Sequence, residues 1–412
     1  MTGGAILNST FTWLDYSERE RRRVRDVLDV FREQETVDEL GIGVIRDAFA
    51  DLLFPGTSTT MTRARYFLFV PWIYLRLEKS HIPGERFATR LREDEMRLMR
   101  ALLASGETEG VIGRVARDRL QRLPSNIYWL GLGVWGIRLF PGGQVDYQRT
   151  LDSFYVSVRR SLATREEESD EFGARRNWAE LPPIPEGFPD IAGIHLRRVD
   201  AEYLQERICS TTARTGQETL MSYLVGRGKS IDVPYVWELP QVAAAPEHIA
   251  RWVVHMRNFS EAMHGGALLY NLMLAQLDAR EKRIEEYIER LGTWRAVMDS
   301  RQHELAEWDR HAFWGLVQVS GVGVGPRTRS FVDAWLEIVL VERRRAGLAN
   351  DADARALIER REEQLKGGRA RLSSKGALEN WSGWSGASQM SYRWGIASRI
   401  LADIYEGLRA DA

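Results

Sequence analysis

The chain has 412 residues, of which 44% are hydrophobic and 28% charged, and its formal net charge at pH 7 is −1. This length can bury a large core or build two or three domains. A net charge so close to zero excludes a general attraction to nucleic acid, so any such binding must come from a local patch. Cys209 is the only cysteine, which excludes intramolecular disulfides and thiolate metal clusters.

The first twenty residues lack the basic start and long apolar run of a signal peptide, and no apolar run reaches the length of a membrane span. We therefore expect a cytoplasmic protein that does not bind a membrane. The seven histidines match no zinc motif, because His303 and Glu307 lack the second histidine of a zinc-protease helix. We expect neither a metal nor a cofactor.

Amphipathic periodicity predicts helices along most of the chain. Ser17 and Glu20 form a capping box for a helix that ends near Glu35. Further helices are expected at 45–54, 62–79, 84–105, 110–122, 146–165, 200–209, 216–225, 246–278, 280–312, 326–346, 351–366 and 387–409. The sequence thus predicts a mainly α, multi-helical protein with two lobes and at most a small β-hairpin.

Charge is unevenly distributed. Residues 62–160 hold 17 arginines and lysines against 10 acidic residues, whereas residues 166–190 hold 8 acidic residues against 2 basic ones. The acidic, proline-rich stretch is typical of a linker. We therefore predict an N-terminal lobe at 1–165, a linker at 166–190 and a C-terminal lobe at 191–412.

Residues 84–150 have the order of a winged helix: helices, a turn at Pro124, an aromatic helix, and a possible hairpin at Pro141–Gly143. The aromatic helix offers almost no group that could hydrogen-bond a base edge, so we expect it to be buried. Contacts with DNA would instead be made to phosphates by arginines of the preceding segment, namely Arg114, Arg117, Arg119 and Arg122.

A possible anion site lies at residues 55–66, where Thr62 is a candidate N-cap of a very apolar helix. Arg63 and Arg65 would then lie in its first turn, where the helix dipole disfavours cations. A bound phosphate, also held by the hydroxyls of Thr57 and Ser58, would explain them. Alternatively, both arginines pair with carboxylates of a neighbouring helix.

A second basic cluster lies near the C-terminus, where Arg369, Arg371 and Arg393 flank a loop rich in glycine, serine and tryptophan. Basic and aromatic groups together suit single-stranded nucleic acid. The same loop could instead dock on the N-terminal half through Trp381 and Trp384. Tryptophans within the predicted helices are expected to fill the core rather than stack on bases.

The other motifs give weaker indications of function. Residues 226–230 lack the first glycine of a phosphate-binding loop, and the glycines of 321–326 join two predicted helices, so neither predicts a nucleotide site. Asp47 and Asp51 lie four residues apart on one helix face and could form a paired-carboxylate site, although such acids are usually solvated. Nothing in the sequence requires an enzyme.

The string LGIGVIRDAFADLLFPGTSTTMTRARYFLFVPW at 40–72, with FTWLDYSE before it and LKGGRARL and YRWG near the end, resembles an uncharacterised family of bacterial proteins. The likeness, to a domain-of-unknown-function family, runs through most of the chain and defines no catalytic residues. The resemblance implies that the gene for this protein lies near helicase, nuclease or methyltransferase genes in a phage-defence island.

These observations predict a non-enzymatic accessory subunit of a bacterial antiviral defence system, which binds nucleic acid, namely DNA, and works with other defence proteins such as a helicase. One alternative is a structural scaffold that binds a partner protein through helix faces. A second is a metal-dependent nuclease that uses Asp47 and Asp51.

Overall fold

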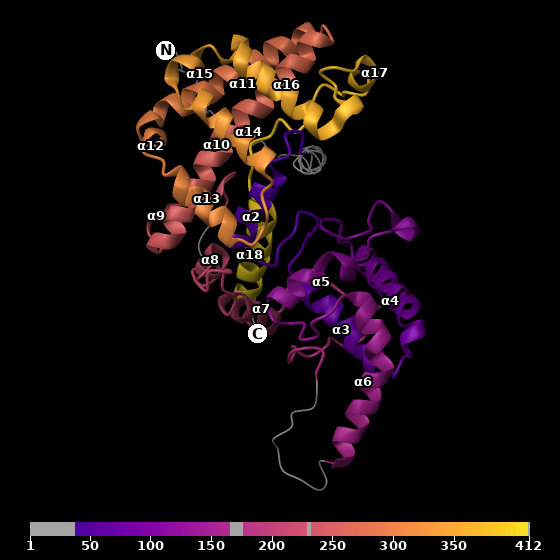
Figure 1. Cartoon of the computed structure of the whole chain (residues 1–412). Coiled ribbons are helices and arrows are strands. Elements are labelled where there is room, and N and C mark those ends of the chain that lie inside the picture. Colours follow the sequence, from indigo (N-terminus) through magenta and orange to yellow (C-terminus); the bar gives the residue numbers. More distant parts are fainter. Residues whose placement is uncertain (1–37, 165–175, 229–231, 411–412) are drawn as a thin grey trace, which may run out of the picture. The chain divides into compact units, whose positions relative to one another are not determined.

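The computed structural model describes residues 38–164, 176–228 and 232–410, and the protein is mainly α-helical as predicted (Figure 1). Within these residues there is no strand, and β-pairing is limited to the isolated bridges Arg138–Trp178 and Thr212–Glu218. The helix predicted to begin at Ser17 lies outside the described residues.

The chain divides into two compact units. The smaller unit contains the described residues up to 41 together with 264–295 and 346–388, and the larger unit contains 42–263, 296–345 and the residues from 389 onward. This division differs from the predicted lobes, because the segments on both sides of 166–190 belong to the larger unit. Segments distant in sequence build each unit, which a local change in composition cannot reveal.

The larger unit begins with α2 (Gly43–Leu53), α3 (Tyr66–Lys79), α4 (Gly84–Ala104), α5 (Pro124–Val134), α6 (Gln144–Thr164), α7 (Arg198–Cys209), α8 (Leu220–Val225) and α9 (Pro240–Ala243). It also contains α12 (Gln302–Ala306), α13 (Arg310–Val319), α14 (Pro326–Val339), most of α15 (Glu342–Ala346) and α18 (Trp394–Arg409). Two long helices, α10 (Glu247–Leu277) and α11 (Glu281–Ser300), contribute residues to both units. The smaller unit adds α16 (Ala352–Lys366) and α17 (Lys375–Leu378).

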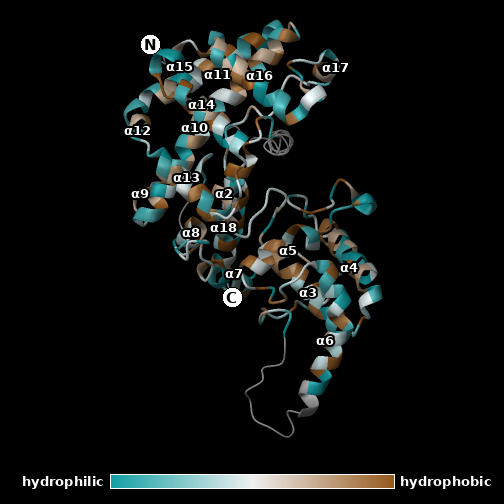
Figure 2. Cartoon of the chain, in the orientation of Figure 1, coloured by the Kyte–Doolittle hydropathy of each residue, from teal (hydrophilic) through white to brown (hydrophobic). Residues whose placement is uncertain are grey.

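Helix α3 is the buried centre of its neighbourhood, as its apolar sequence predicts. Every residue from Tyr66 to Tyr74 is buried, and α4 and α5 pack against it. The ring of Phe67 stacks on Trp135 with centroids 3.8 Å apart. Figure 2 shows the apolar character of α5, and only one face of the helix is buried, with Ile127, Tyr128 and Leu132, while Leu130 is exposed. The buried tryptophans, among them Trp72, Trp252 and Trp335, confirm that indoles fill the core.

Two predicted elements of the winged-helix-like segment are absent. Residues 110–122 form no α-helix, only a 3₁₀ turn at Arg117–Arg119, because Gly110 and Gly113 take positive φ values that an α-helix cannot contain. The prediction of a hairpin at Pro141–Gly143 is also wrong. The chain enters α6 directly after these residues, and Arg138 forms its β-bridge with Trp178. Among the described helices, none is both long and apolar enough to cross a membrane.

A buried carboxyl group joins α4 to the start of α5. Glu95 is 1% exposed, and its Oε1 accepts a hydrogen bond of 2.6 Å from the backbone N–H of Ser125. Its Oε2 lies 3.0 Å from the Ser125 hydroxyl. Burial raises the pKa of Glu95 to about 8, since the charged form would lose most of its hydration.

This carboxyl makes stability depend on pH. The folded chain keeps the Glu95 proton up to about pH 8, whereas the unfolded chain loses it near pH 4.5, so stability falls as pH rises between these values. Glu95→Gln imitates the protonated form. We expect the stability of the wild type relative to this variant to fall by up to about 1.4 kcal/mol per pH unit across that interval, measured by denaturant unfolding. The exposed Glu85→Gln change should give no such difference; equal pH profiles for all three proteins would contradict this assignment.

Candidate nucleic-acid interface

Arg63 lies before helix α3, not in its first turn as predicted, because α3 begins at Tyr66 with Arg65 as its N-cap residue. The Nε of Arg63 is 3.0 Å from both carboxyl oxygens of Asp403 in α18, which also accepts a 2.8 Å hydrogen bond from the Ala64 N–H. Arg63 is 9% exposed. Although burial opposes its charge, hydrogen bonding to Asp403 raises the pKa of Arg63.

Arg65 is also buried and bound within the chain. One guanidinium nitrogen donates to the carbonyl oxygens of Gly193, at 2.8 Å, and His195. The other lies 3.4 Å from the carboxylate of Asp200, which is fully buried at the start of α7. Burial lowers the pKa of Arg65. The alternative interpretation, pairing with carboxylates of other helices, therefore describes both arginines.

The neighbouring hydroxyls do not converge on a common point. Thr57 donates to the carbonyl of Phe54 at 2.7 Å, and Ser58 lies 3.3 Å from the hydroxyl of Thr60. Thr62, the predicted N-cap, instead donates to the carbonyl of Gly110 at 2.7 Å. Each of these hydroxyls has a different partner within the chain, so they do not form a shared oxyanion pocket.

Arg393 holds the two acids of α2. It donates to Asp51 at 2.6 Å, to Asp47 at 3.3 Å and to the carbonyl of Thr57 at 2.9 Å. A guanidinium thus lies where a nuclease metal would be needed. No cluster of three or more potential metal ligands occurs in the part of the chain that the structure describes.

In the smaller unit, Arg371 donates to Glu39 at 2.6 Å and to the Ser385 hydroxyl at 2.8 Å. The loop that contains Ser385 packs on α10, because the Ser385 N–H donates to Asn271 at 2.9 Å. The loop therefore docks mainly on α10 and α11 in the C-terminal half, whereas the prediction placed it on the N-terminal half, which it reaches at Glu39. Arg369 differs: it is exposed and forms no ion pair with a described residue.

The segment 110–123, here called the arginine loop, is anchored by apolar side chains. Val111, Ile112 and Leu120 are at most 9% exposed. The Ile112 N–H donates to the hydroxyl of Tyr66 at 3.0 Å, and Arg92 of α4 donates to the carbonyl of Leu120 at 2.9 Å. The loop backbone is therefore fixed to α3 and α4.

Two glycines allow the arginine loop to lie this close to the core. A side chain on Gly110 would place its Cβ 2.5 Å from the Cγ of Arg63, and one on Gly113 would meet the sulfur of Met99 at 2.6 Å. Both glycines have positive φ, 75° and 89°. Larger residues would therefore push the loop away from the core.

Four arginines of this loop point away from the anchor: Arg114, Arg117, Arg119 and Arg122 are all exposed. None of their guanidinium groups forms an ion pair with a described residue. The only acid between them, Asp118, lies 2.8 Å from Arg100 of α4. The loop thus presents four unneutralised cations, each of which can bind a phosphate by two parallel hydrogen bonds.

The sequence identified all four of these arginines as phosphate contacts but did not identify what holds them. Arg92 and Arg100, which fix the loop, lie in a helix with many charged residues and have no distinguishing spacing. Arg117 has a φ of 50°, which is unusual for a non-glycine residue. The contacts around the loop must therefore stabilise this backbone conformation.

Comparisons with known proteins agree with the resemblance seen in the sequence. No curated protein and no solved structure matches the chain. A family model described as a family of unknown function (DUF6361) matches residues 8–407. Because this match covers nearly all 412 residues, the chain belongs to the DUF6361 family.

Proposed function

We propose that this protein binds the phosphate backbone of nucleic acid through the arginine loop. The observation that supports the proposal most is the fixed backbone carrying four exposed arginines without acidic partners in the described chain. Because the contacts with α3 and α4 already fix the loop backbone, binding does not have to order it, and the unneutralised guanidinium groups can release counterions from the nucleic acid. Binding to the backbone carries no sequence preference, in keeping with the lack of base-reading groups on α5.

Arg63 and Thr62 have a positioning role in this proposal. Arg63 lies 3.4 Å from the carbonyl of Glu109, and Thr62 donates to the next carbonyl, that of Gly110. They fix the start of the arginine loop, while their side chains remain inside the protein. Arg369 is a further exposed cation, carried by the smaller unit.

The biological setting we propose is a non-enzymatic accessory subunit of a bacterial antiviral system, acting on DNA with a helicase or similar partner. The resemblance of residues 40–72 to a family associated with phage-defence islands supports this setting. Purification together with the products of adjacent genes tests it. Recovery of a stable complex with such a protein is expected; a chain that purifies alone under all salt conditions would contradict the subunit role.

A gel-shift titration at low salt tests nucleic-acid binding. We expect the full chain to shift duplex DNA irrespective of sequence, and incubation with Mg²⁺ or Mn²⁺ to leave the DNA intact. Cleavage that is lost on Asp47→Asn with Asp51→Asn would instead support the nuclease alternative.

Binding of a partner protein is the second candidate function, and two exposed apolar side chains favour it. Val115 of the arginine loop is 85% exposed and Leu130 of α5 is 74% exposed. If Val115 contacts a partner protein, Val115→Asp should abolish partner capture, whereas alanine in place of the four arginines should weaken it only slightly.

A further inference from the structure

The tip of the arginine loop, residues 114–119, carries an apolar side chain between arginines. All six of its residues are exposed, and Val115 is 85% exposed, more than any other large apolar side chain of the described residues. Arg114 precedes it directly, and Arg117 follows two residues later. Exposed valines are common on protein surfaces, so it is the position of Val115, rather than its exposure alone, that indicates a function.

A hydrogen-bonded turn holds Val115 away from the core. The N–H of Arg117 donates to the carbonyl of Gly113 at 2.7 Å, which closes a turn around residues 114–116 with Val115 at its centre. The N–H of Leu120 donates to the carbonyl of Arg117 at 3.0 Å and closes the next turn. The apolar side chain is therefore presented on a backbone that is already ordered, so its binding to another surface costs little additional entropy.

The charges around Val115 favour phosphates on both sides of it. Neither Arg114 nor Arg117 forms an ion pair with a described residue. The acid of the tip, Asp118, lies 2.8 Å from Arg100 of α4, so a cation already compensates its charge. An apolar group between two unneutralised cations matches the minor groove of a duplex, where two phosphate backbones run on either side of the stacked base pairs.

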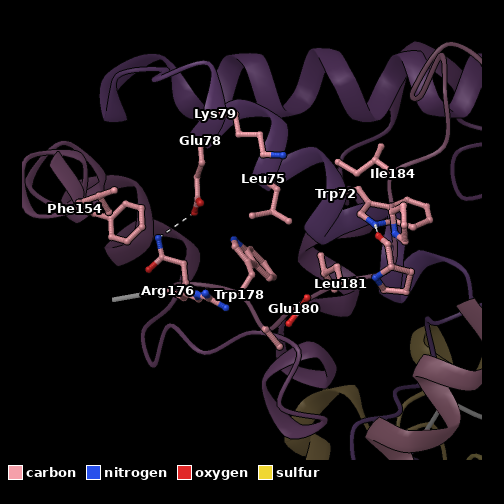
Figure 3. A pocket seen from close by; sticks show the side chains of 15 residues that line it. Trp72, Leu75, Glu78, Lys79, Phe154, Arg176, Trp178, Glu180, Leu181 and Ile184 are labelled. Carbon is pink, nitrogen blue, oxygen red and sulfur yellow. Dashed lines mark hydrogen bonds between the residues drawn. The ribbon is translucent and has the colours of Figure 1, made fainter. Parts of the chain in front are cut away.

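The arginine loop lacks the aromatic side chains that hold single strands by stacking on their bases. Residues 110–123 contain no phenylalanine, tyrosine, tryptophan or histidine. The aromatic cavity of about 420 Å³ between α3, α6 and residues 176–184 offers no substitute (Figure 3). Its two indoles, Trp72 and Trp178, are at most 2% exposed and present no ring face to a base. The loop therefore suits a duplex, whose base steps accept apolar wedges, better than a single strand.

We propose that Val115 acts as a wedge, which enters the minor groove of duplex DNA and partly unstacks one base step. This inference rests on the proposed function of the arginine loop and specifies the form of DNA that the loop binds. Arg114 and Arg117 contact the phosphates on either side of the opened step, while Arg119 and Arg122 hold phosphates further along. Apolar wedges of this kind kink a duplex by about 20–90°. Because unstacking is easier where pairing is already weak, the protein prefers a duplex that contains a mismatch.

Two valine-to-alanine substitutions separate the wedge from a general effect of exposed apolar groups. Val115→Ala shortens the side chain at the tip and leaves the four loop arginines in place. Val319→Ala makes the same change at a 50% exposed position of α13, also in the larger unit. Because both side chains are exposed, both full-length variants should unfold at the wild-type temperature, which is checked first.

The measurement uses a short duplex with one central mismatch and the same duplex fully paired. A 2-aminopurine base beside the mismatch reports unstacking by its emission, and dyes at the two ends report bending by energy transfer. We expect the wild type and Val319→Ala to raise both signals and to bind the mismatched duplex at least tenfold more tightly than the paired one. Val115→Ala should raise neither signal and reduce this preference to less than about threefold. The salt dependence of its binding should stay at the wild-type slope, because the substitution removes no charge.

Failure of the wedge can be distinguished from failure of the arginine loop. If the wild type bound both duplexes without a change in either signal, or if both variants gave equal signals, the wedge would be wrong and phosphate binding would stand. A single strand of the same sequence that bound as tightly as the duplex would also overturn the wedge. So would loss of partner-protein capture in Val115→Ala with wild-type signals on DNA, which would assign Val115 to a protein interface. If the wild type bound none of these DNAs, the proposed function itself would be wrong, and the wedge with it.

Discussion

Replacing Arg63 with methionine is expected to lower the free energy of unfolding by about 3–5 kcal/mol. The substitution keeps most of the side-chain volume but leaves the carboxylate of Asp403 buried without its guanidinium partner. Among the described residues, the Ala64 N–H would remain as the hydrogen-bond donor to this carboxylate. It also removes the guanidinium that bridges α18 and the start of the arginine loop. Urea or guanidinium unfolding of the purified variant, followed by circular dichroism, measures the change.

Arg114→Met is the matched control for this experiment. It makes the same chemical change at an exposed arginine without an ionic partner in the described chain, so the free energy of unfolding should change by no more than about 0.5 kcal/mol. If the two variants were equally stable, Arg63 would not be a buried structural cation, and an external anion would again be needed to explain it.

Removing the four exposed arginines of the loop together is expected to weaken DNA binding by about 100-fold at low salt. The variant carries alanine at Arg114, Arg117, Arg119 and Arg122. Since these side chains contact no described carboxylate, the protein should keep its fold and melting temperature. Equilibrium binding to a fluorescent duplex, at constant salt and pH, measures the loss.

A control variant with the same change in net charge separates local from general electrostatics. Alanine at Arg149, Arg159, Arg327 and Arg343 removes four other exposed arginines of the larger unit. We expect its affinity for DNA to stay within about threefold of the wild type. Equal losses in both variants would mean that overall charge, rather than the arginine loop, determines binding.

Most of the helices follow from the sequence because their apolar positions repeat with helical spacing. Helices α4, α6 and α16 lie within two residues of their predicted bounds, and the glycines of 321–326 connect two helices as expected. The prediction of a helix at 110–122 was wrong for a local reason. Its apolar residues fit a helical pattern, but Gly110 and Gly113 have the positive φ that lets the chain lie close to Arg63 and Met99.

The partners of the predicted site residues could not be read from the sequence. Asp403 lies 340 positions from Arg63 and Asp200 lies 135 from Arg65, and no local pattern links such pairs. Arginine spacing alone cannot distinguish a cation that is neutralised within the fold from one that is free to bind phosphate. Burial distinguishes them: Arg63 and Arg65 lie inside, whereas Arg114 and Arg117 are exposed.

The salt dependence of DNA binding tests the proposed interface most directly. Each phosphate contact that is lost should reduce the slope of log affinity against log salt concentration by about 0.9. We predict a slope about 3 to 4 units shallower for the variant lacking the four loop arginines, and a wild-type slope for the control variant. Identical slopes for all three proteins would contradict the arginine loop as the site of backbone binding.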